Sequence, residues 1–186
     1  MTVTLELVNK LPRQCGDCQL CCKLLPVQEI GKLAGVRCRH QAHGVGCRVY
    51  GPGMPSSCRL WSCAWLTGSF NGRRPDRTHY VVDILPDFIT AVDDASGRKV
   101  TVPVVQVWCD PGFPLAHRDP DLRKYLDERG KDGVAALIRY GSGDAFALIP
   151  PAMGGWIETE RKPPGEKQHT FAQVAQALGS GRPAST

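Results

Sequence analysis

The chain has 186 residues, of which 42% are hydrophobic and 22% are charged, and this ordinary balance excludes a wholly disordered protein. A chain of this length can bury one hydrophobic core, or one core with a small satellite module. Its net charge of +5 is unevenly spread, because residues 1–75 carry ten Lys and Arg against three Asp and Glu, whereas residues 76–186 carry thirteen against fifteen.

The first residues, MTVTLELVNKLPRQ, lack the charged segment and the apolar run of a signal peptide. No apolar stretch reaches the length needed to span a bilayer, since even VTVPVVQVW is short and contains Pro103. We therefore predict a cytoplasmic protein with no membrane partner. In that compartment thiols stay reduced, and cysteine clusters bind metal more often than they form disulfides.

Cysteines crowd the N-terminal half of the chain. Eight of the nine lie between residues 15 and 63, in a segment rich in the turn-forming residues Gly, Pro and Ser. Such a segment buries little apolar surface, so a hydrophobic core alone does not order it. Burial as small apolar side chains and disulfide pairing both suit this pattern less well than metal binding. The sequence therefore predicts a set of metal ligands: Cys15, Cys18, Cys21, Cys22, Cys38, Cys47, Cys58 and Cys63.

The stretch CGDCQLCC at residues 15–22 holds four of these thiols. As two turns of helix it would place all four on one side of the helix, and as extended chain it would fold back through its C-x-x-C pairs. The adjacent Cys21 and Cys22 do not easily supply two corners of one zinc tetrahedron, so they serve two metals or one of them bridges. Eight thiolates suit two tetrahedral zinc sites or one multinuclear cluster, such as an iron–sulfur centre, and the spacing leaves both open. In either case we predict two or more ions of zinc or iron.

From about residue 79 the pattern changes to that of strands. Residues 79–85, 87–94 and 99–108 are rich in β-branched side chains, and ASG between the second and third predicts a hairpin. Pro103 places the third strand at an edge or at a bulge. Residues 119–130 predict a helix, with Asp119 as N-cap, Pro120 in the first turn and Gly130 after its end.

Residues 134–140 and 144–150 predict two further strands, and residues 170–179 predict a second helix capped by Thr170. Together the elements predict an α+β fold. It consists of a cysteine-rich metal module of loops and short helices at residues 1–75, packed on a small antiparallel sheet with one or two helices at residues 76–180. The two units can share one core, and residues 181–186 are predicted to form a disordered tail.

Five further residues are weaker candidates for a role at the metal site. His40 and His43 are potential ligands for zinc or iron, although a histidine in a loop is most often only solvated. Cys109 ends a strand and is predicted to be a small buried residue rather than a ninth ligand. Trp61 and Trp65 flank Cys63, and we expect them to pack over the metal site and exclude water.

Arginines stand beside four of the cysteines: Arg37, Arg39, Arg48 and Arg59. We expect them to offset the negative charge of metal-bound thiolates, since neighbouring cations stabilise thiolate over thiol. The alternative is an electrostatic footprint for nucleic acid. Few aromatic residues alternate with the basic ones, as stacking on single strands would require, so we do not expect nucleic acid as a partner.

The string Cys15-x-x-Cys18-x-x-Cys21-Cys22, followed by Cys38, by Cys47-Arg-Val-Tyr50 and by Pro55-x-x-Cys58-Arg59-Leu-Trp61-Ser-Cys63, resembles the YkgJ-like CxxCxxCC cysteine-cluster family, which is described as a zinc- or iron-chelating domain. The resemblance covers about residues 15–66 and implies the same eight cysteines as ligands. The chain departs from the family at Met54, where Arg is usual, and in a Tyr-to-Pro gap that is one residue longer. Some relatives are similar to flagellin lysine methylases, in which these cysteines are thought to hold an iron–sulfur cluster.

The sequence favours two classes of function over a third, a zinc-based nucleic-acid binder. In the first, the chain is a metal-binding protein whose zinc or iron ions chiefly order the N-terminal module, and the α+β unit contacts an unidentified protein or small-molecule partner. In the second, which the methylase relatives imply, it is an iron- or iron–sulfur-dependent enzyme that modifies a protein. The sequence has no Walker loop, no G-x-G-x-x-G after a strand and no H-E-x-x-H. It therefore names no catalytic residue and leaves open whether the chain is an enzyme.

Overall fold

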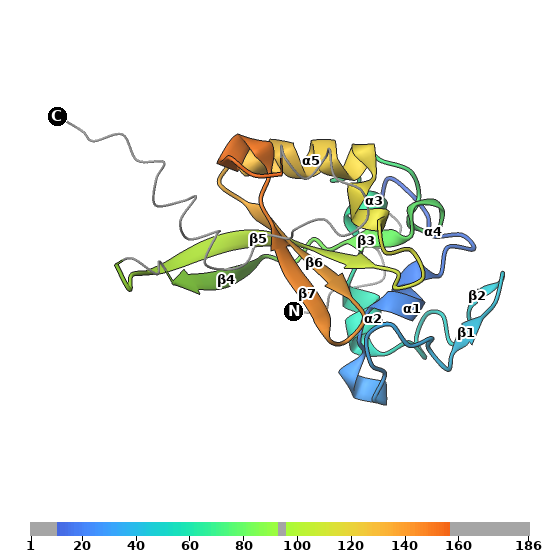
Figure 1. Ribbon diagram of the computed structural model, residues 1–186. Coiled ribbons are helices and arrows are strands. Elements are labelled where there is room, and N and C mark those ends of the chain that lie inside the picture. Colours follow the sequence, from blue (N-terminus) through green and yellow to red (C-terminus); the bar gives the residue numbers. More distant parts are fainter. Residues whose placement is uncertain (1–10, 93–95, 157–186) are drawn as a thin grey trace.

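A five-stranded sheet is the centre of the computed structural model, which describes residues 11–92 and 96–156 (Figure 1). β3 (Tyr80–Val82) and β4 (Asp87–Val92) lie end to end along one side of the long strand β5 (Lys99–Cys109). β6 (Ala135–Tyr140) lies on the other side of β5, and β7 (Asp144–Leu148) pairs with β6. The predicted α+β class is confirmed, as is the antiparallel pairing of β4 with β5.

One strand pair differs from the predicted antiparallel sheet. β5 and β6 run parallel, with Val104 opposite Ala135 and Cys109 opposite Tyr140. The chain between them contains the short turn η3 (Ala116–Arg118) and helix α5 (Pro120–Lys131). Parallel strands need such a crossover, because a tight turn can join only antiparallel neighbours. The helix that the sequence predicted is thus the reason why this pair is parallel.

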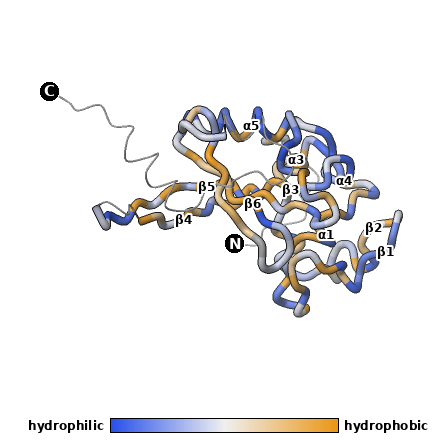
Figure 2. Tube along the Cα trace, in the orientation of Figure 1, coloured by the Kyte–Doolittle hydropathy of each residue, from blue (hydrophilic) through white to orange (hydrophobic). Residues whose placement is uncertain are grey.

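Helix α5 covers one face of the sheet (Figure 1). Its Leu122 and Leu126 are fully buried and pack with Ala136 and Ile138 of β6. The alternate residues of β6 belong to a second cluster on the opposite face, as the two-residue period of a strand requires. This cluster consists of Ile89, Val102, Val104, Ala135, Leu137, Ala147 and Ile149. Burial on both faces explains the hydrophobic trace along β5 and β6 in Figure 2.

Pro103 lies where only one side of β5 is paired. It stands opposite Phe88 of β4, and the pairing of β5 with β6 begins one residue later, at Val104. Residues 99–103 therefore form a two-stranded extension with one free edge, where proline costs no ladder hydrogen bond. The predicted edge is therefore only local to Pro103, because β5 as a whole is the central strand of the sheet, paired with β3 and β4 on one side and with β6 on the other.

The N-terminal module consists of short helices and one small hairpin. Its elements are α1 (Leu20–Leu24), the short turn η2 (Gln28–Ile30), β1 (Gln41–Ala42), β2 (Gly46–Cys47), α2 (Ser56–Leu60), α3 (Ala64–Thr67) and α4 (Pro75–Thr78). Leu20 and Leu24 of α1 are buried in one cluster with Val81 of β3. Lys23 of α1 donates to Asp110, just beyond β5, at 2.7 Å. The module is thus packed on the sheet, and the boundary between residues 75 and 76 stays a prediction.

The helix predicted at residues 170–179 and the tail at residues 181–186 lie outside the described residues, which end after the short turn η4 (Pro151–Met153) at residue 156. Within residues 11–92 and 96–156, no helix has the length and apolar character that crossing a bilayer requires.

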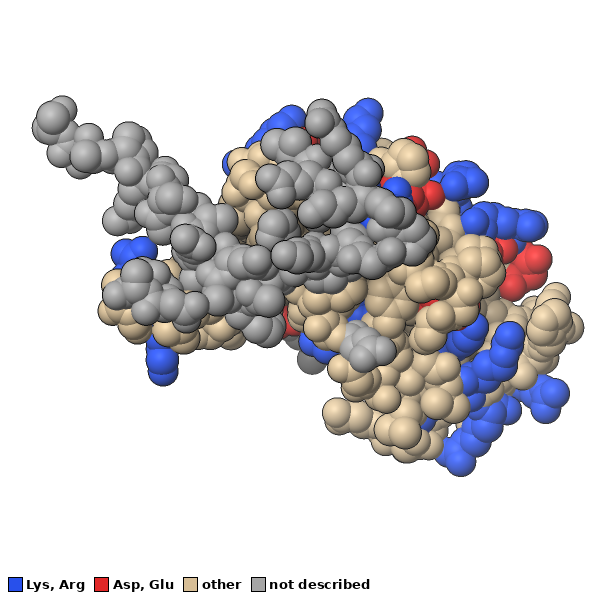
Figure 3. Space-filling model, viewed as in Figure 1, with Lys and Arg blue, Asp and Glu red and all other residues tan. Residues whose placement is uncertain are grey.

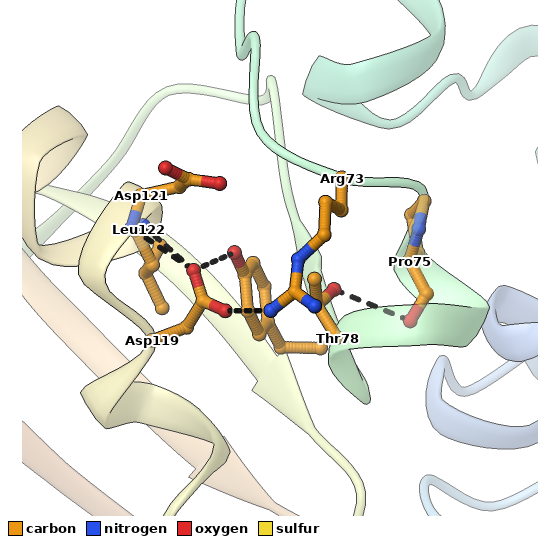
Figure 4. A network of polar contacts seen from close by, with 7 residues as sticks. Arg73, Pro75, Thr78, Asp119, Asp121 and Leu122 are labelled. Carbon is orange, nitrogen blue, oxygen red and sulfur yellow. Dashed lines mark hydrogen bonds and ion pairs between the residues drawn. The ribbon is translucent and has the colours of Figure 1, made fainter.

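Asp119 joins α5 to the sheet and to the loop before α4 (Figure 4). Its Oδ1 accepts the backbone N–H of Asp121 at 3.0 Å and of Leu122 at 3.3 Å, as predicted for an N-cap. The same oxygen accepts the hydroxyl of Tyr80 at 3.1 Å, and Oδ2 pairs with Arg73 at 2.9 Å. Desolvation of its hydroxyl, with the Asp119 carboxylate beside it, raises the pKa of Tyr80 far above its usual value, so this phenol stays a hydrogen-bond donor.

Replacing Asp119 with Ala is expected to lower the free energy of unfolding by about 2 kcal/mol, because it removes the helix cap and leaves the buried Tyr80 hydroxyl without its acceptor. Urea denaturation followed by far-UV circular dichroism measures the change. The control is Asp121→Ala, which removes an exposed carboxylate of the same helical turn and should change stability by no more than about 1 kcal/mol. Equal effects of the two substitutions would contradict the role assigned to Asp119.

Candidate metal centre

All nine cysteines of the chain are free thiols. The eight predicted ligands lie in the N-terminal module, on or beside α1, β2, α2 and α3. In the part of the chain that the structure describes, no group of three or more His, Cys, Asp or Glu side chains is preformed as a metal-binding group. The ligand set therefore stays a prediction.

Residues 15–19 do not form the helical turn that one of the two alternatives for residues 15–22 assumed. The backbone N–H of Cys18 donates to the carbonyl of Cys15 at 3.0 Å, and Gly16 between them has φ = 55°. This left-handed conformation favours glycine and interrupts a right-handed helix. Helix α1 consequently begins only at Leu20 and contains just two of the four thiols. The four do not share one helix face.

Two arginines that the sequence did not single out hold this turn in place. Arg13 donates to the carbonyl of Trp65 at 2.8 Å, and its guanidinium lies over the Trp65 ring. Arg74 pairs with Asp17, inside the turn, at 2.7 Å. The segment carrying Cys15 is thus fastened on both sides to residues that follow Cys63.

The hairpin β1–β2 brings two more thiols towards α1. The N–H of Cys38 donates to the carbonyl of Cys22 at 2.9 Å, and the N–H of Gln41 donates to the carbonyl of Cys38 at 3.0 Å. Gln41 stands opposite Cys47 in the hairpin. Its side-chain amide donates to Gln19, next to α1, at 2.7 Å. Cys38 and Cys47 are therefore tied to the same helix by backbone and side-chain contacts.

Helix α2, which carries Cys58, is held through its first turn. The carboxylate of Glu29 accepts the backbone N–H of Ser56 and of Ser57, each at 2.7 Å. These hydrogen bonds lower the pKa of Glu29, chiefly through Ser57. Because Glu29 lies in η2, shortly after α1, the contact ties Cys58 to the same part of the module.

Cys63 is the most deeply placed of the eight thiols. It is 8% exposed, precedes α3, and forms an isolated β-bridge with Asp83 beyond β3. Trp61 donates its ring N–H to the Asp83 carboxylate at 2.8 Å. Trp61 and Trp65 pack against the apolar cluster that contains Cys63, as expected from their positions. That they also cover a metal stays a prediction.

Desolvation and mutual repulsion act on several of these thiols. Desolvation raises the pKa of Cys15 to about 11, and the nearby thiolates of Cys63 and Cys18 raise it further. Desolvation is also the largest reason why the pKa of Cys63 lies above its usual value. At neutral pH these groups are protonated, so binding a metal would release protons.

The pKa of Cys58 shows the same effect in the other half of the module. It is raised first by desolvation and then by the thiolates of Cys22, Cys38 and Cys47. Ionising all of them together is unfavourable unless a cation enters between them. Soft thiolate donors at this density suit zinc or iron, so the chemistry of the donor set fits the predicted metals.

Cys22 differs from its neighbours because its pKa is lowered to about 7. The main cause is a hydrogen bond donated by the thiol of Cys21, whose own pKa is raised by the same contact. Lys32 adds a second favourable influence. Its ammonium group donates to the carbonyls of Leu25, of Lys23 at 3.2 Å and of Leu33 at 3.3 Å. Lys32 is only 7% exposed, so it is a fixed cation beside the thiols.

The four arginines next to cysteines in sequence are all exposed. Figure 3 shows Lys and Arg side chains gathered over the N-terminal module. Among the leading influences on the thiol pKa values, the cations are Lys32 and Arg74. Charge compensation by Arg37, Arg39, Arg48 and Arg59 therefore stays a prediction, and sequence adjacency alone did not find the closer cations.

The structure places the weaker ligand candidates, His40, His43 and Cys109, in different surroundings. The backbone N–H of His40 donates to the sulfur of Cys38 at 3.4 Å, and His43 is exposed beside the hairpin turn. A ligand role for either imidazole stays untested. Cys109 is 1% exposed and belongs to the core cluster that contains Leu122 and Leu126 of α5. Burial raises its pKa to about 12. Its predicted role as a small buried residue is confirmed.

A cavity of about 300 Å³ lies beside α5, and no cysteine is among the residues that line it. Its lining is mostly polar and consists of Ser69, Phe70, Asn71, Gly72, Asp121, Lys124, Tyr125 and Glu128.

Comparison of the chain with protein-family models, with curated proteins and with solved structures gave no match. The resemblance to the cysteine-cluster family therefore rests on the motif in residues 15–66 alone.

Replacing Lys32 with Met is expected to raise the pKa of Cys22 and to slow its alkylation severalfold at pH 7, because the buried cation that favours the thiolate is lost. Metal-free, reduced protein is labelled with iodoacetamide between pH 6 and 9, and each cysteine is quantified by mass spectrometry. In the wild-type protein Cys22 should be half-ionised near pH 7. Arg37→Met removes an exposed cation next to Cys38 and serves as the control. An unchanged profile for Lys32→Met would show that Lys32 does not act on Cys22.

Proposed function

We propose that the chain is a metal-binding protein that chelates zinc or iron through its eight N-terminal cysteines, and that the metal chiefly orders the N-terminal module. One observation carries the proposal: none of residues 33–62 is buried. Five large apolar side chains of this segment are more than half exposed, namely Leu33, Val36, Val45, Tyr50 and Leu60, and Val49, Met54 and Trp61 are only partly buried. So little burial does not offset the conformational entropy lost when such a segment is ordered.

Metal–thiolate bonds are a source of free energy of the required kind. One structural zinc site contributes about 10 kcal/mol or more to folding in small modules. The segment without buried residues contains three of the predicted ligands, Cys38, Cys47 and Cys58. Its contacts with α1 and η2, described above, hold it near the remaining thiols. Metal bound there would tie residues 33–62 to the part of the module that is packed on the sheet.

The donor set supports zinc or iron and two or more ions. Cys15, Cys18, Cys21, Cys22, Cys38, Cys47, Cys58 and Cys63 would hold them. Bound zinc would be structural, whereas an iron–sulfur centre would add one-electron chemistry. A reducing compartment such as the cytoplasm suits eight free thiols.

The α+β unit is the proposed contact surface for an unidentified protein or small molecule. The cavity beside α5 has the volume at which small-ligand sites begin. Because none of its lining residues is a cysteine, the proposal keeps the metal structural and assigns it no catalytic step.

Anaerobically purified protein is expected to carry stoichiometric metal, measured by elemental analysis together with a visible absorption spectrum. Zinc should give a colourless protein with about two ions per chain, and iron–sulfur ligation a brown one. Cys22→Ser should lower the metal content, whereas Cys109→Ser, which alters the buried thiol of β5, should leave it unchanged. Removing the metal should increase hydrogen exchange in residues 33–62 and spare β5 and β6, because only the former lack buried side chains. Protein without stoichiometric zinc or iron would refute the proposal.

A further inference from the structure

One stretch of the N-terminal module carries positive charge and no negatively charged side chain. Residues 30–75 contain seven Lys and Arg and no Asp or Glu. Glu29, just before this stretch, is already engaged, since its carboxylate accepts the backbone N–H of Ser56 and of Ser57. A surface whose exposed charges have one sign attracts partners of the opposite sign.

The arginines of this stretch are of two kinds. Arg73 pairs with Asp119 at 2.9 Å. Arg74 pairs with Asp17 at 2.7 Å and with Asp76 at 2.6 Å. Within residues 11–92 and 96–156, by contrast, no ion pair is formed by the four exposed ones, Arg37, Arg39, Arg48 and Arg59. A guanidinium in this state can donate two parallel hydrogen bonds to a carboxylate from outside the chain.

The hairpin β1–β2 directs one of these arginines away from the rest of the module. Gln41 stands opposite Cys47, and the Gln41 side chain donates to Gln19 beside α1. The next pair along the hairpin is joined by the N–H of Arg48, which donates to the carbonyl of His40 at 2.8 Å. Because side chains alternate between the two faces of a strand, Arg48 lies on the face that points away from α1.

Exposed apolar side chains accompany these arginines. Val45, in the turn of the hairpin, is 81% exposed, and Leu60, next to Arg59 on α2, is 70% exposed. Exposed apolar side chains that gather on one surface mark sites where another protein binds. Single-stranded nucleic acid is bound instead through aromatic stacking, and among the five exposed apolar side chains of residues 33–62 only Tyr50 is aromatic. The composition of this surface therefore favours a protein partner.

The positive charges of this module are gathered in one region of the molecule. On the face seen in Figure 3, Lys and Arg side chains lie over and around the hairpin β1–β2, whereas the Asp and Glu side chains most visible in this view lie nearer to α4 and α5. A partner that meets the module from this side meets positive charge first.

We propose that the exposed face of residues 33–62 is a docking surface for an acidic protein segment that also carries apolar side chains. The carboxylates of the segment pair with the four exposed arginines, and its apolar side chains cover Val45, Tyr50 and Leu60. Complementary charge sets the choice of partner and the rate of association. This surface is separate from the contact proposed for the α+β unit, and it does not depend on which metal the thiols bind.

Fluorescence anisotropy with a designed peptide tests the surface. Full-length protein, purified with its metal, is added to a labelled peptide of about 15 residues in which Glu and Asp alternate with Leu and Phe. Arg48→Glu should weaken binding about tenfold or more, because it turns attraction into repulsion. Val45→Ser should weaken it severalfold, because an apolar contact is lost. The control Arg98→Glu makes the same change of charge at an exposed position beside β5 and should leave binding unchanged.

Two further probes separate the possible partners. A peptide with the same carboxylates but Ala in place of Leu and Phe should bind more weakly than the first peptide, and so should a single-stranded RNA oligonucleotide. Tighter binding of the RNA, or equal binding by wild type and Val45→Ser, would overturn the proposal for a protein segment. Absence of binding to the first peptide would overturn it as well.

The metal content of every variant is measured alongside and should equal that of the wild type. Loss of metal from Arg48→Glu would mean that this arginine balances thiolate charge, which would overturn the docking surface while leaving metal binding intact. Wild-type protein that binds the peptide but carries no stoichiometric metal would overturn the proposed function alone and would support the docking surface.

Discussion

When several thiols in one small module ionise, their thiolates repel one another in surroundings that are partly desolvated. Desolvation is the main reason why the pKa values of Cys15 and Cys58 are raised, and repulsion from the thiolates of other cysteines adds to it. The same module has a long segment, residues 33–62, in which no side chain is buried. A cation bound between the sulfurs would remove the repulsion and would cross-link the segment that lacks a core. A bound cation would therefore offset both the repulsion among the thiolates and the shortage of apolar contacts.

The sheet and α5 provide the rigid side of this arrangement. Leu20 and Leu24 of α1 are buried with Val81 of β3, and Cys63 is joined to Asp83 by a β-bridge. The ion pair of Lys23 with Asp110 connects the helix that carries Cys21 and Cys22 to the end of β5. Cys63 and the helix that carries Cys21 and Cys22 are thus placed by contacts with the sheet, whereas Cys38, Cys47 and Cys58 lie in a segment without buried residues that is held by hydrogen bonds. This asymmetry is the reason to expect metal to order one part of the module more than the other.

The positively charged side chains around the thiols form two sets, one fixed beside the sulfurs and one exposed. Lys32 is buried against backbone carbonyls and Arg74 is held by two carboxylates, so both are fixed close to the sulfurs. Arg37, Arg39, Arg48 and Arg59 lie outside them and are exposed. A fixed cation in partly desolvated surroundings acts on a thiol more strongly than an exposed and solvated one. The cations near the thiols therefore consist of an inner pair, Lys32 and Arg74, that acts on the thiols and an outer set of four exposed arginines.

The sequence by itself determined the local features of this protein: the α+β class, the β4–β5 hairpin, the capping of α5 by Asp119 and the burial of Cys109. Each depends on residues close in the chain, where propensity, turn chemistry and hydrophobic period act directly. Only the tertiary structure decided that β5 and β6 are parallel, that α1 contains two rather than four of the first thiols, and that Lys32 and Arg74 are the cations beside them. Those outcomes depend on contacts between distant segments, such as Arg74 with Asp17 or Cys38 with Cys22, which no local pattern encodes. For the same reason the spacing of the cysteines named a ligand set but not the conformation of the segments that carry it.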